Sequence, residues 1–143
     1  MVRTYDVSRI YVSVNGIPIT GFADGTFIKV TRAGDAYTRV VGADGVVSRA
    51  KSNDKSGEIA IILSQTSPSN KVLSSIALLD ELSGGGVVPI GVSDAVSGSK
   101  YVAAHAWVRK QPDVEYGKEI SNREWVLDCS NITFVTLGAD LDG

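Results

Sequence analysis

The residue types that most often carry out chemistry are scarce in this sequence. Its 143 residues include one histidine, His105, and one cysteine, Cys129. A catalytic histidine needs a nucleophile and an orienting carboxylate, and a catalytic cysteine needs a base. The sequence around His105 gives no sign of such partners, and the residues around Cys129 are largely apolar. We therefore interpret His105, in an apolar strand, as a packed or hydrogen-bonded structural residue and Cys129 as an ordinary buried thiol.

Other motifs resemble parts of known sites without completing them. The glycine-rich stretch 83–88 lacks the Lys-Ser/Thr pair of a phosphate-binding loop, and it follows a predicted helix instead of opening one. Three carboxylates, Asp113, Glu115 and Glu119, could pair as in a glycosidase. They lie in the polar stretch 111–122, which we interpret as an exposed loop or a segment ordered by a partner. One histidine and one cysteine cannot make a typical structural zinc site. We therefore expect no enzyme activity, no cofactor and no metal.

Composition indicates a soluble globular protein. The sequence is 43% apolar and 21% charged, with a formal net charge of −2 and a pI near 5.3. This balance gives no overall basic footprint for sequence-specific nucleic-acid binding. No apolar block of signal-peptide length opens the chain, and no run reaches the ~18–20 apolar residues of a membrane helix. We expect a protein that is made and kept soluble and that does not insert into membranes.

Most of the chain is typical of strands separated by turns. In 7–14, Ile10, Val12 and Val14 fall on one face, which we expect to be buried. The run 58–66 is nearly continuously apolar, so we expect a strand that is covered on both faces. Apolar patterns bounded by Gly, Asn and Asp turn signals predict the remaining strands at 26–32, 35–41, 46–52, 87–94, 99–110 and 123–137.

One amphipathic helix interrupts the strands at about 68–82. Ser67 can cap it, Pro68 suits its first position, and the glycines at 84–86 end it. We expect a stripe of apolar residues to pack against the sheet, while Leu78 could face a neighbouring subunit. Several strands and one flanking helix predict a mainly β fold, a β-sandwich or barrel closed on one side by the helix. The stripe consists of Val72, Ile76, Leu79 and Leu82, widened by Leu73 and Leu78.

A charged hairpin arm is expected at about 42–57. One turn falls at 42–45 and a second at 53–57, both rich in Gly, Asn and Asp. Arg49, Lys51 and Lys55 make the hairpin mildly basic, short of a nucleic-acid-binding stripe. Turn residues and charges cannot build a core of their own. We therefore expect the loop to be flexible in the isolated subunit and ordered by a neighbour.

Two long blocks of this sequence resemble a family of tailed-phage structural proteins. The block 42–76, "GADGVVSRAKSNDKSGEIAIILSQTSPSNKVLSSI", is similar to the family's central turn, charged hairpin, strand and helix. The block 106–132, "AWVRKQPDVEYGKEISNREWVLDCSNI", is similar to its C-terminal segment, and 5–25 fits its first strand pair. The resemblance covers nearly the whole chain. These proteins are tail tube subunits, mostly of contractile-tailed phages.

The resemblance implies a fold, an assembly and a location. It implies a single tail-tube-like domain, 1–143, with a β-sandwich and flanking helix shared with the type VI secretion tube protein. Six copies would form a ring, and rings would stack into a hollow tube that conducts double-stranded DNA during ejection. Partners would be the tail sheath, tape-measure and baseplate proteins. The subunit would be assembled in the bacterial host cytoplasm and would belong to the tail of the virion.

Contacts between subunits or rings are expected in two polar segments, the arm and the stretch 111–122. Two alternatives to the phage tube remain at this stage: a type VI or bacteriocin-like tube subunit, and a small ligand-binding β-sandwich. A ligand-binding domain would be a monomer with an aromatic-lined groove, yet aromatic residues make up only 7% of the chain and are dispersed. The candidate contact residues are Asp44, Arg49, Lys51, Asp54 and Lys55 in the arm, and Asp113, Glu115, Tyr116, Lys118 and Glu119 in the stretch.

Overall fold

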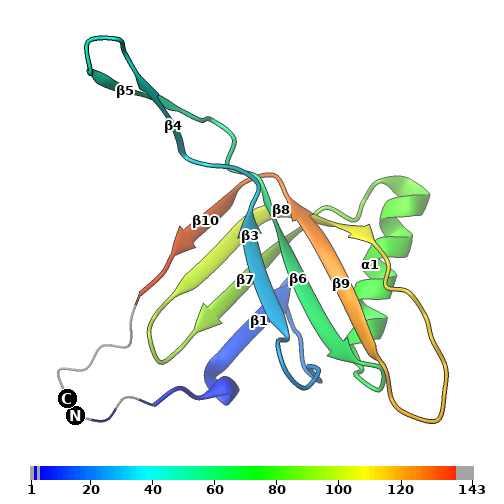
Figure 1. Cartoon of the computed structure of the whole chain (residues 1–143). Coiled ribbons are helices and arrows are strands. Elements are labelled where there is room, and N and C mark those ends of the chain that lie inside the picture. Colours follow the sequence, from blue (N-terminus) through cyan, green and yellow to red (C-terminus); the bar gives the residue numbers. More distant parts are fainter. Residues whose placement is uncertain (1, 3, 138–143) are drawn as a thin grey trace.

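The computed structural model describes residues 2 and 4–137 of the chain (Figure 1). Strands dominate it, and its α-helix lies between the sixth and seventh strands in chain order. The elements are a 3-10 helix at Val7–Arg9, then β1 (Ile10–Val14), β2 (Ile17–Pro18), β3 (Ile28–Arg32), β4 (Tyr37–Val41), β5 (Val47–Lys51), β6 (Gly57–Ser64), α1 (Ser69–Ser83), β7 (Val88–Asp94), β8 (Lys100–Lys110), β9 (Asn122–Cys129) and β10 (Ile132–Val135).

Eight strands form one antiparallel sheet, and β4 and β5 form a separate pair. The order in the large sheet is β2-β1-β7-β8-β9-β6-β3, with β10 pairing to β8 beside β9. The segment 19–27 links the two ends of this path. Ile19 N donates to the carbonyl of Val12 in β1, and Ala23 N donates to the carbonyl of Ile62 in β6. The sheet therefore curls around one core, as the predicted sandwich or barrel requires.

The core is lined by alternate residues of the strands, as the sequence pattern predicted. In β1, Val12 and Val14 are buried, and in β6 the side chains of Ile59, Ile61 and Leu63 are fully buried. The opposite face of β6 is only partly covered, since Glu58 and Ile62 retain some exposure. In the isolated chain, therefore, one face of β6 is buried as predicted, and the other face is covered only in part.

Helix α1 closes one side of this core, but the predicted face is rotated. Leu73, Ile76 and Ala77 are the buried apolar residues of the helix, whereas Leu79 is half-exposed. Trp125 of β9 donates its indole N–H to Oδ1 of Asn70, at 2.9 Å, and this contact helps to fix the rotation of the helix. The predicted stripe was therefore right at Val72, Leu73 and Ile76, which lie in the core or pack against it. It was wrong at Leu79 and at Leu82, which is 86% exposed. Leu78 is exposed, as expected of a residue that could face a neighbouring subunit.

The helix begins and ends where the sequence predicted. The hydroxyl of Ser67 accepts the backbone N–H of Ser69 at 3.2 Å, while Pro68 stands at the cap position itself. At the other end, Gly84 adopts a left-handed conformation with φ of 72°, and its N–H donates to the carbonyl of Asp80. Glycine is favoured here because a side chain would strain this conformation. No helix among the described residues is long and apolar enough to cross a membrane.

Two predicted strands are shorter than their sequence patterns. Residues 7–9 form a 3-10 turn because the carboxylate of Asp6 accepts both the N–H and the hydroxyl of Ser8. The predicted strand 123–137 divides into β9 and β10 at a corner. There, Ser130 N donates to the carbonyl of His105 and Ile132 N donates to that of Lys55. These bonds turn the chain, so that β10 pairs with the first half of β8 and β9 with the second half.

Candidate interaction surfaces

The most exposed structured part of the molecule is the hairpin of β4 and β5, which we call the arm. It projects from the body of the fold beyond β3 and β6 (Figure 1), and every residue of its two strands is exposed. The predicted hairpin at 42–57 began too late. The pairing starts at Tyr37, opposite Lys51, and the Gly-Ala-Asp-Gly turn at 42–45 forms the tip.

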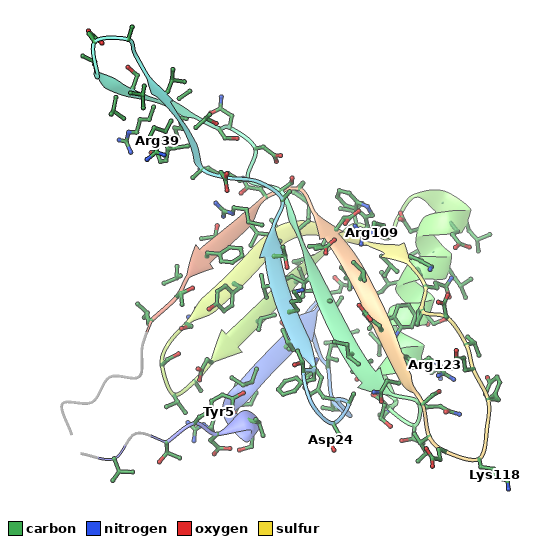
Figure 2. All side chains as sticks on the ribbon, in the orientation of Figure 1. Tyr5, Asp24, Arg39, Arg109, Lys118 and Arg123 are labelled. Carbon is green, nitrogen blue, oxygen red and sulfur yellow. The ribbon has the colours of Figure 1, made fainter. Side chains whose placement is uncertain are left out.

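One face of the arm carries apolar and basic side chains in a fixed order. The register pairs Val41 with Val47 next to the tip and Arg39 with Arg49 directly behind. Because side chains alternate between faces along a strand, these four residues share one face. The guanidinium of Arg49 also lies 4.2 Å from the centroid of the Tyr37 ring. Figure 2 labels Arg39, which sequence reasoning missed as a contact residue.

The acidic contact candidates of the arm are used in its turns. Asp44 accepts the N–H of Val46, and Asp54 accepts both the N–H and the hydroxyl of Ser56. These hydrogen bonds from Ser56 lower the pKa of the Asp54 carboxyl below its usual value. The carbonyl of Lys55 accepts the N–H of Ile132 and so ties the base of the arm to the body. Beyond this base, no other described part of the chain packs against β4 and β5, whose residues are all exposed.

A second exposed segment, the loop 111–121, joins β8 to β9. Its C-terminal end is anchored, because the amide oxygen of Gln65 accepts both the N–H and the hydroxyl of Ser121. The guanidinium of Arg123 donates to the Ser121 hydroxyl at 2.6 Å and lies 5.7 Å from the ring centroid of Tyr116. Lys110 pairs with Asp113 at 3.5 Å on the open surface. The other candidates in the loop are exposed: Glu115, Tyr116, Lys118 and Glu119.

A charged cluster lies on the outer face of the sheet formed by β6, β9 and the end of β8. Arg109 bridges two carboxylates, Glu58 at 2.8 Å and Asp128 at 3.3 Å. All three side chains are partly exposed, so the cluster contributes little to stability, on the order of 1 kcal/mol or less. Its consequence is electrostatic: Arg109, labelled in Figure 2, is neutralised by its two carboxylate neighbours.

The single histidine, His105, and the single cysteine, Cys129, lie in surroundings that differ in exposure. His105 is exposed, at a β-bulge where Pro89 of β7 cannot donate a backbone N–H to the ladder. The interpretation of His105 as a packed side chain was therefore wrong, although its carbonyl does accept the N–H of Ser130. Cys129 is 1% exposed, as expected of a buried thiol. Burial, and then the charge of Asp128, raise its pKa to about 11, so the thiol stays protonated at neutral pH.

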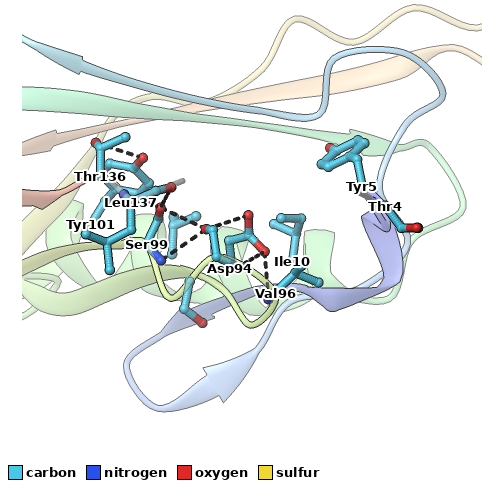
Figure 3. A pocket seen from close by; sticks show the side chains of 12 residues that line it. Thr4, Tyr5, Ile10, Asp94, Val96, Ser99, Tyr101, Thr136 and Leu137 are labelled. Carbon is cyan, nitrogen blue, oxygen red and sulfur yellow. Dashed lines mark hydrogen bonds between the residues drawn. The ribbon is translucent and has the colours of Figure 1, made fainter. Parts of the chain in front are cut away.

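The described residues include no group of three or more His, Cys, Asp or Glu side chains that could hold a metal ion. A cavity of about 490 Å³ lies at the turn between β7 and β8 (Figure 3). Its carboxylate, Asp94, accepts the N–H of Val96 and the hydroxyl of Ser97, and Ser99 binds the backbone of Leu137. These polar groups therefore stabilise the turn between β7 and β8 and bind the segment that follows β10.

The sequence is similar to that of known phage structural proteins. Residues 10–138 match the family described as "Bacteriophage PhiTE tail tube protein". The chain is 28% identical over 139 residues to "Structural protein ORF10" of Pseudomonas phage KPP10, covering 92% of this chain and 80% of that protein.

Solved structures share the fold at low sequence identity. The tube-terminating cap of the anti-feeding prophage superposes with a TM-score of 0.65 at 12% identity, over 95% of each chain. A chain of the extended sheath–tube complex of the PVC extracellular contractile injection system gives 0.62 at 14% identity, over 94% of this chain and 93% of that one. The fold class predicted from the sequence is thus confirmed, and so is the resemblance that its motifs indicated. The chain belongs to the family of the bacteriophage PhiTE tail tube protein and is a structural subunit of a phage tail tube.

Proposed function

We propose that six copies of this subunit close into a ring and that rings stack into the hollow tube of a contractile tail. The observation that carries this proposal is a section of the sheet that is bounded by two unpaired strand edges. In the part of the chain that the structure describes, β3 pairs only with β6. The end of β8, from Trp107 to Lys110, likewise has β9 on one side and no pairing to β7 on the other.

These two edges bound one section of the sheet, in the order β3-β6-β9-β8. Unpaired strand edges expose backbone N–H and C=O groups that pair readily with another chain. If β3 of one copy lies against β8 of the next, the sections join into a continuous closed barrel and neither of these two edges remains unpaired. Such a contact joins two different surfaces and is therefore heterologous, which generates a ring when the rotation closes.

The outer face of this section would line the channel. It carries the carboxylates Glu58, Glu124 and Asp128 and the cations Lys29 and Arg109. The arginine is already paired with Glu58 and Asp128. Phosphate groups bind where Lys and Arg are clustered and free. A wall whose arginine is neutralised holds double-stranded DNA weakly, as passage during ejection requires.

Two exposed segments provide the contacts beyond the ring. We assign the arm and the loop 111–121 to contacts between stacked rings or neighbouring subunits, and other tail components bind at the outer surface and ends of the tube. These components are the sheath, tape-measure and baseplate proteins, and the subunits assemble in the host cytoplasm before they enter the virion. The contact residues are Asp44, Arg49, Lys51, Asp54, Lys55, Asp113, Glu115, Tyr116, Lys118 and Glu119.

Electron microscopy and sedimentation of the purified full chain test this proposal together. Raising the protein concentration should convert a slowly sedimenting species into rings and then into tubes with a central channel. Image averaging of end-on views should give sixfold symmetry. A species that remains monomeric at all concentrations, with no rings in the images, would contradict the proposal. Rings of another symmetry would contradict the hexamer alone.

A further inference from the structure

The arm presents a surface that no other described residue of the chain covers. Val41 and Val47 form an apolar pair that is 58% and 62% exposed, and Arg39 and Arg49 stand directly opposite each other behind it. Like charges directly opposite on an antiparallel pair are destabilising. Every charge on the two arm strands is positive, and none of them forms an ion pair among the described residues. The face therefore matches an acidic partner with apolar side chains.

The other face of the arm is different in kind. It carries Thr38, Val40, Ser48 and Ala50, which are small and uncharged. Val40 is exposed there, like the valines of the first face, so the two faces differ in charge. The uncharged face can therefore serve as an internal control for the charged one. A two-stranded ribbon is also marginally stable by itself in water. Contact along the charged face would supply the cover that the ribbon lacks.

The loop 111–121 offers the complementary chemistry. Three carboxylates, Asp113, Glu115 and Glu119, outnumber the single cation of the loop, Lys118. Apolar side chains are interspersed among them and are strongly exposed, most of all those of Tyr116 and Ile120. Exposed apolar side chains that alternate with charges of one sign are typical of an interaction site.

The arm and this loop stand at opposite ends of the sheet. The arm leaves the body where Arg32 pairs with Gly57, and the loop ends where Asn122 pairs with Ser64. The eight residues of β6 lie between these points and span about 26 Å. Figure 2 shows the separation between Arg39 in the arm and Lys118 in the loop. One copy cannot bring its own arm to its own loop, but two copies placed end to end can.

We infer that the charged face of the arm of one copy binds the loop 111–121 of the next copy along the tube. This inference rests on the proposed stacking of rings and specifies the two surfaces that meet. The valine pair packs against the exposed apolar residues of the loop, and Arg39 and Arg49 bind the carboxylates of Glu115 and Glu119. The contact is heterologous: in a stack, the copies at one end keep a free arm and the copies at the other end keep a free loop. Further copies can therefore add along the axis of the tube.

Charge exchange tests the chemistry of this contact. The double variant Arg39→Glu, Arg49→Glu should fold with an unchanged melting temperature, since the arm lies outside the core, and should lose tube growth. Adding Glu115→Lys and Glu119→Lys in the same chain should restore tubes. The control Thr38→Glu, Ala50→Glu places two glutamates directly opposite each other on the other face and should still form tubes. Normal tubes from the first variant, or no restoration by the exchange, would overturn the inference.

Cysteine cross-linking tests the geometry separately. Val41→Cys combined with Ile120→Cys, in the Cys129→Ser background, should give oxidised tubes that dissociate into a ladder of linked chains. Each copy contributes one arm and one loop, so chains link beyond the dimer. Thr38→Cys with Ile120→Cys, on the opposite face of the arm, should give at least tenfold less product. Tubes that do not cross-link, or that give only arm-to-arm dimers with Val41→Cys alone, would overturn the inference.

The two proposals fail in different ways. If the unaltered protein forms no rings or tubes, the proposed function fails and this contact falls with it. If the unaltered protein forms tubes but its variants fail both the charge-exchange and the cross-linking test, the proposed function is retained and the assignment of the arm to the loop is wrong.

Discussion

Replacing Leu73 by alanine should separate the buried face of α1 from its exposed face. Leu73 is fully buried among the core residues, whereas Leu79, six positions later on the same helix, is 51% exposed. The two substitutions remove the same atoms from the same helix. Helix propensity therefore changes equally in both, and only the burial of the leucine differs.

The magnitude follows from that difference in burial. Truncating a fully buried leucine costs about 2–5 kcal/mol, because apolar transfer energy is lost and a cavity remains. A substitution at a half-exposed surface position usually changes the free energy of unfolding by about 0.5 kcal/mol or less. For a domain of this size, each kcal/mol lowers the melting temperature by about 4 °C. Leu73→Ala should therefore melt roughly 8–20 °C below the unaltered chain, and Leu79→Ala within about 2 °C of it.

Thermal and urea unfolding followed by circular dichroism measure both variants. The protein should be kept at a concentration below assembly, because association stabilises the folded state by mass action. Equal melting temperatures for the two variants would refute the packing described for α1. A larger loss for Leu79→Ala would restore the stripe that the sequence alone suggested.

Three further outcomes can be measured on the same subunit. The pKa of Cys129 is raised to about 11 from an ordinary value of 9.0, so the folded state holds this proton more tightly than the unfolded state does. This contribution to the free energy of unfolding is present below pH 9 and is lost between pH 9 and 11. Urea titrations of the unaltered chain should therefore show a loss of about 2–3 kcal/mol over that interval, and titrations of Cys129→Ala should not. A Cβ on Gly57 would meet the backbone carbonyl of Thr31, so Gly57→Ala should cost about 1–3 kcal/mol, while Gly34→Ala, in open space, should melt normally. His105→Ala should leave melting and tube formation unchanged, and a folded variant that fails to assemble would reveal a contact there.

Local signals determined much of the secondary structure from the sequence. Alternating apolar residues located β1, β3, β6 and β7 because one face of each strand packs in or against the core. The proline at 68 and the glycine at 84 located the ends of α1, since both act through backbone geometry within a single turn. These features depend on neighbours in sequence and so can be read without the fold.

The rotation of α1 could not be predicted in the same way. Apolar residues occupy more than half of its circumference, so the sequence pattern admits several buried faces. Two contacts from distant residues select one of them: the indole of Trp125 on Asn70, and the Ser69 hydroxyl, which accepts the N–H of Thr20. Neither partner is near the helix in sequence. The corner at Ser130 was missed for the same reason, because its backbone partner is His105.

The surfaces were predicted only in part. The arm and the loop 111–121 could be located because their charges and turn residues interrupt the apolar pattern. Arg39 escaped notice because it lies within the predicted strand 35–41, outside the hairpin arm that the sequence predicted at 42–57. Its importance depends on the register that places it opposite Arg49, and a register between two separate strands is a property of the fold.

The arginine pair has a second consequence if the arm binds an acidic loop. An exposed two-stranded ribbon with an apolar tip could pair with another arm, edge to edge or face to face. Two arms that met through their charged faces would bring both copies of Arg39 and Arg49 together, and four desolvated cations repel strongly. The charges that attract the arm to Glu115 and Glu119 would thus also prevent arms from joining each other. A subunit that must wait for the end of a growing tube needs both properties, because pairing between free arms would yield closed dimers that cannot extend.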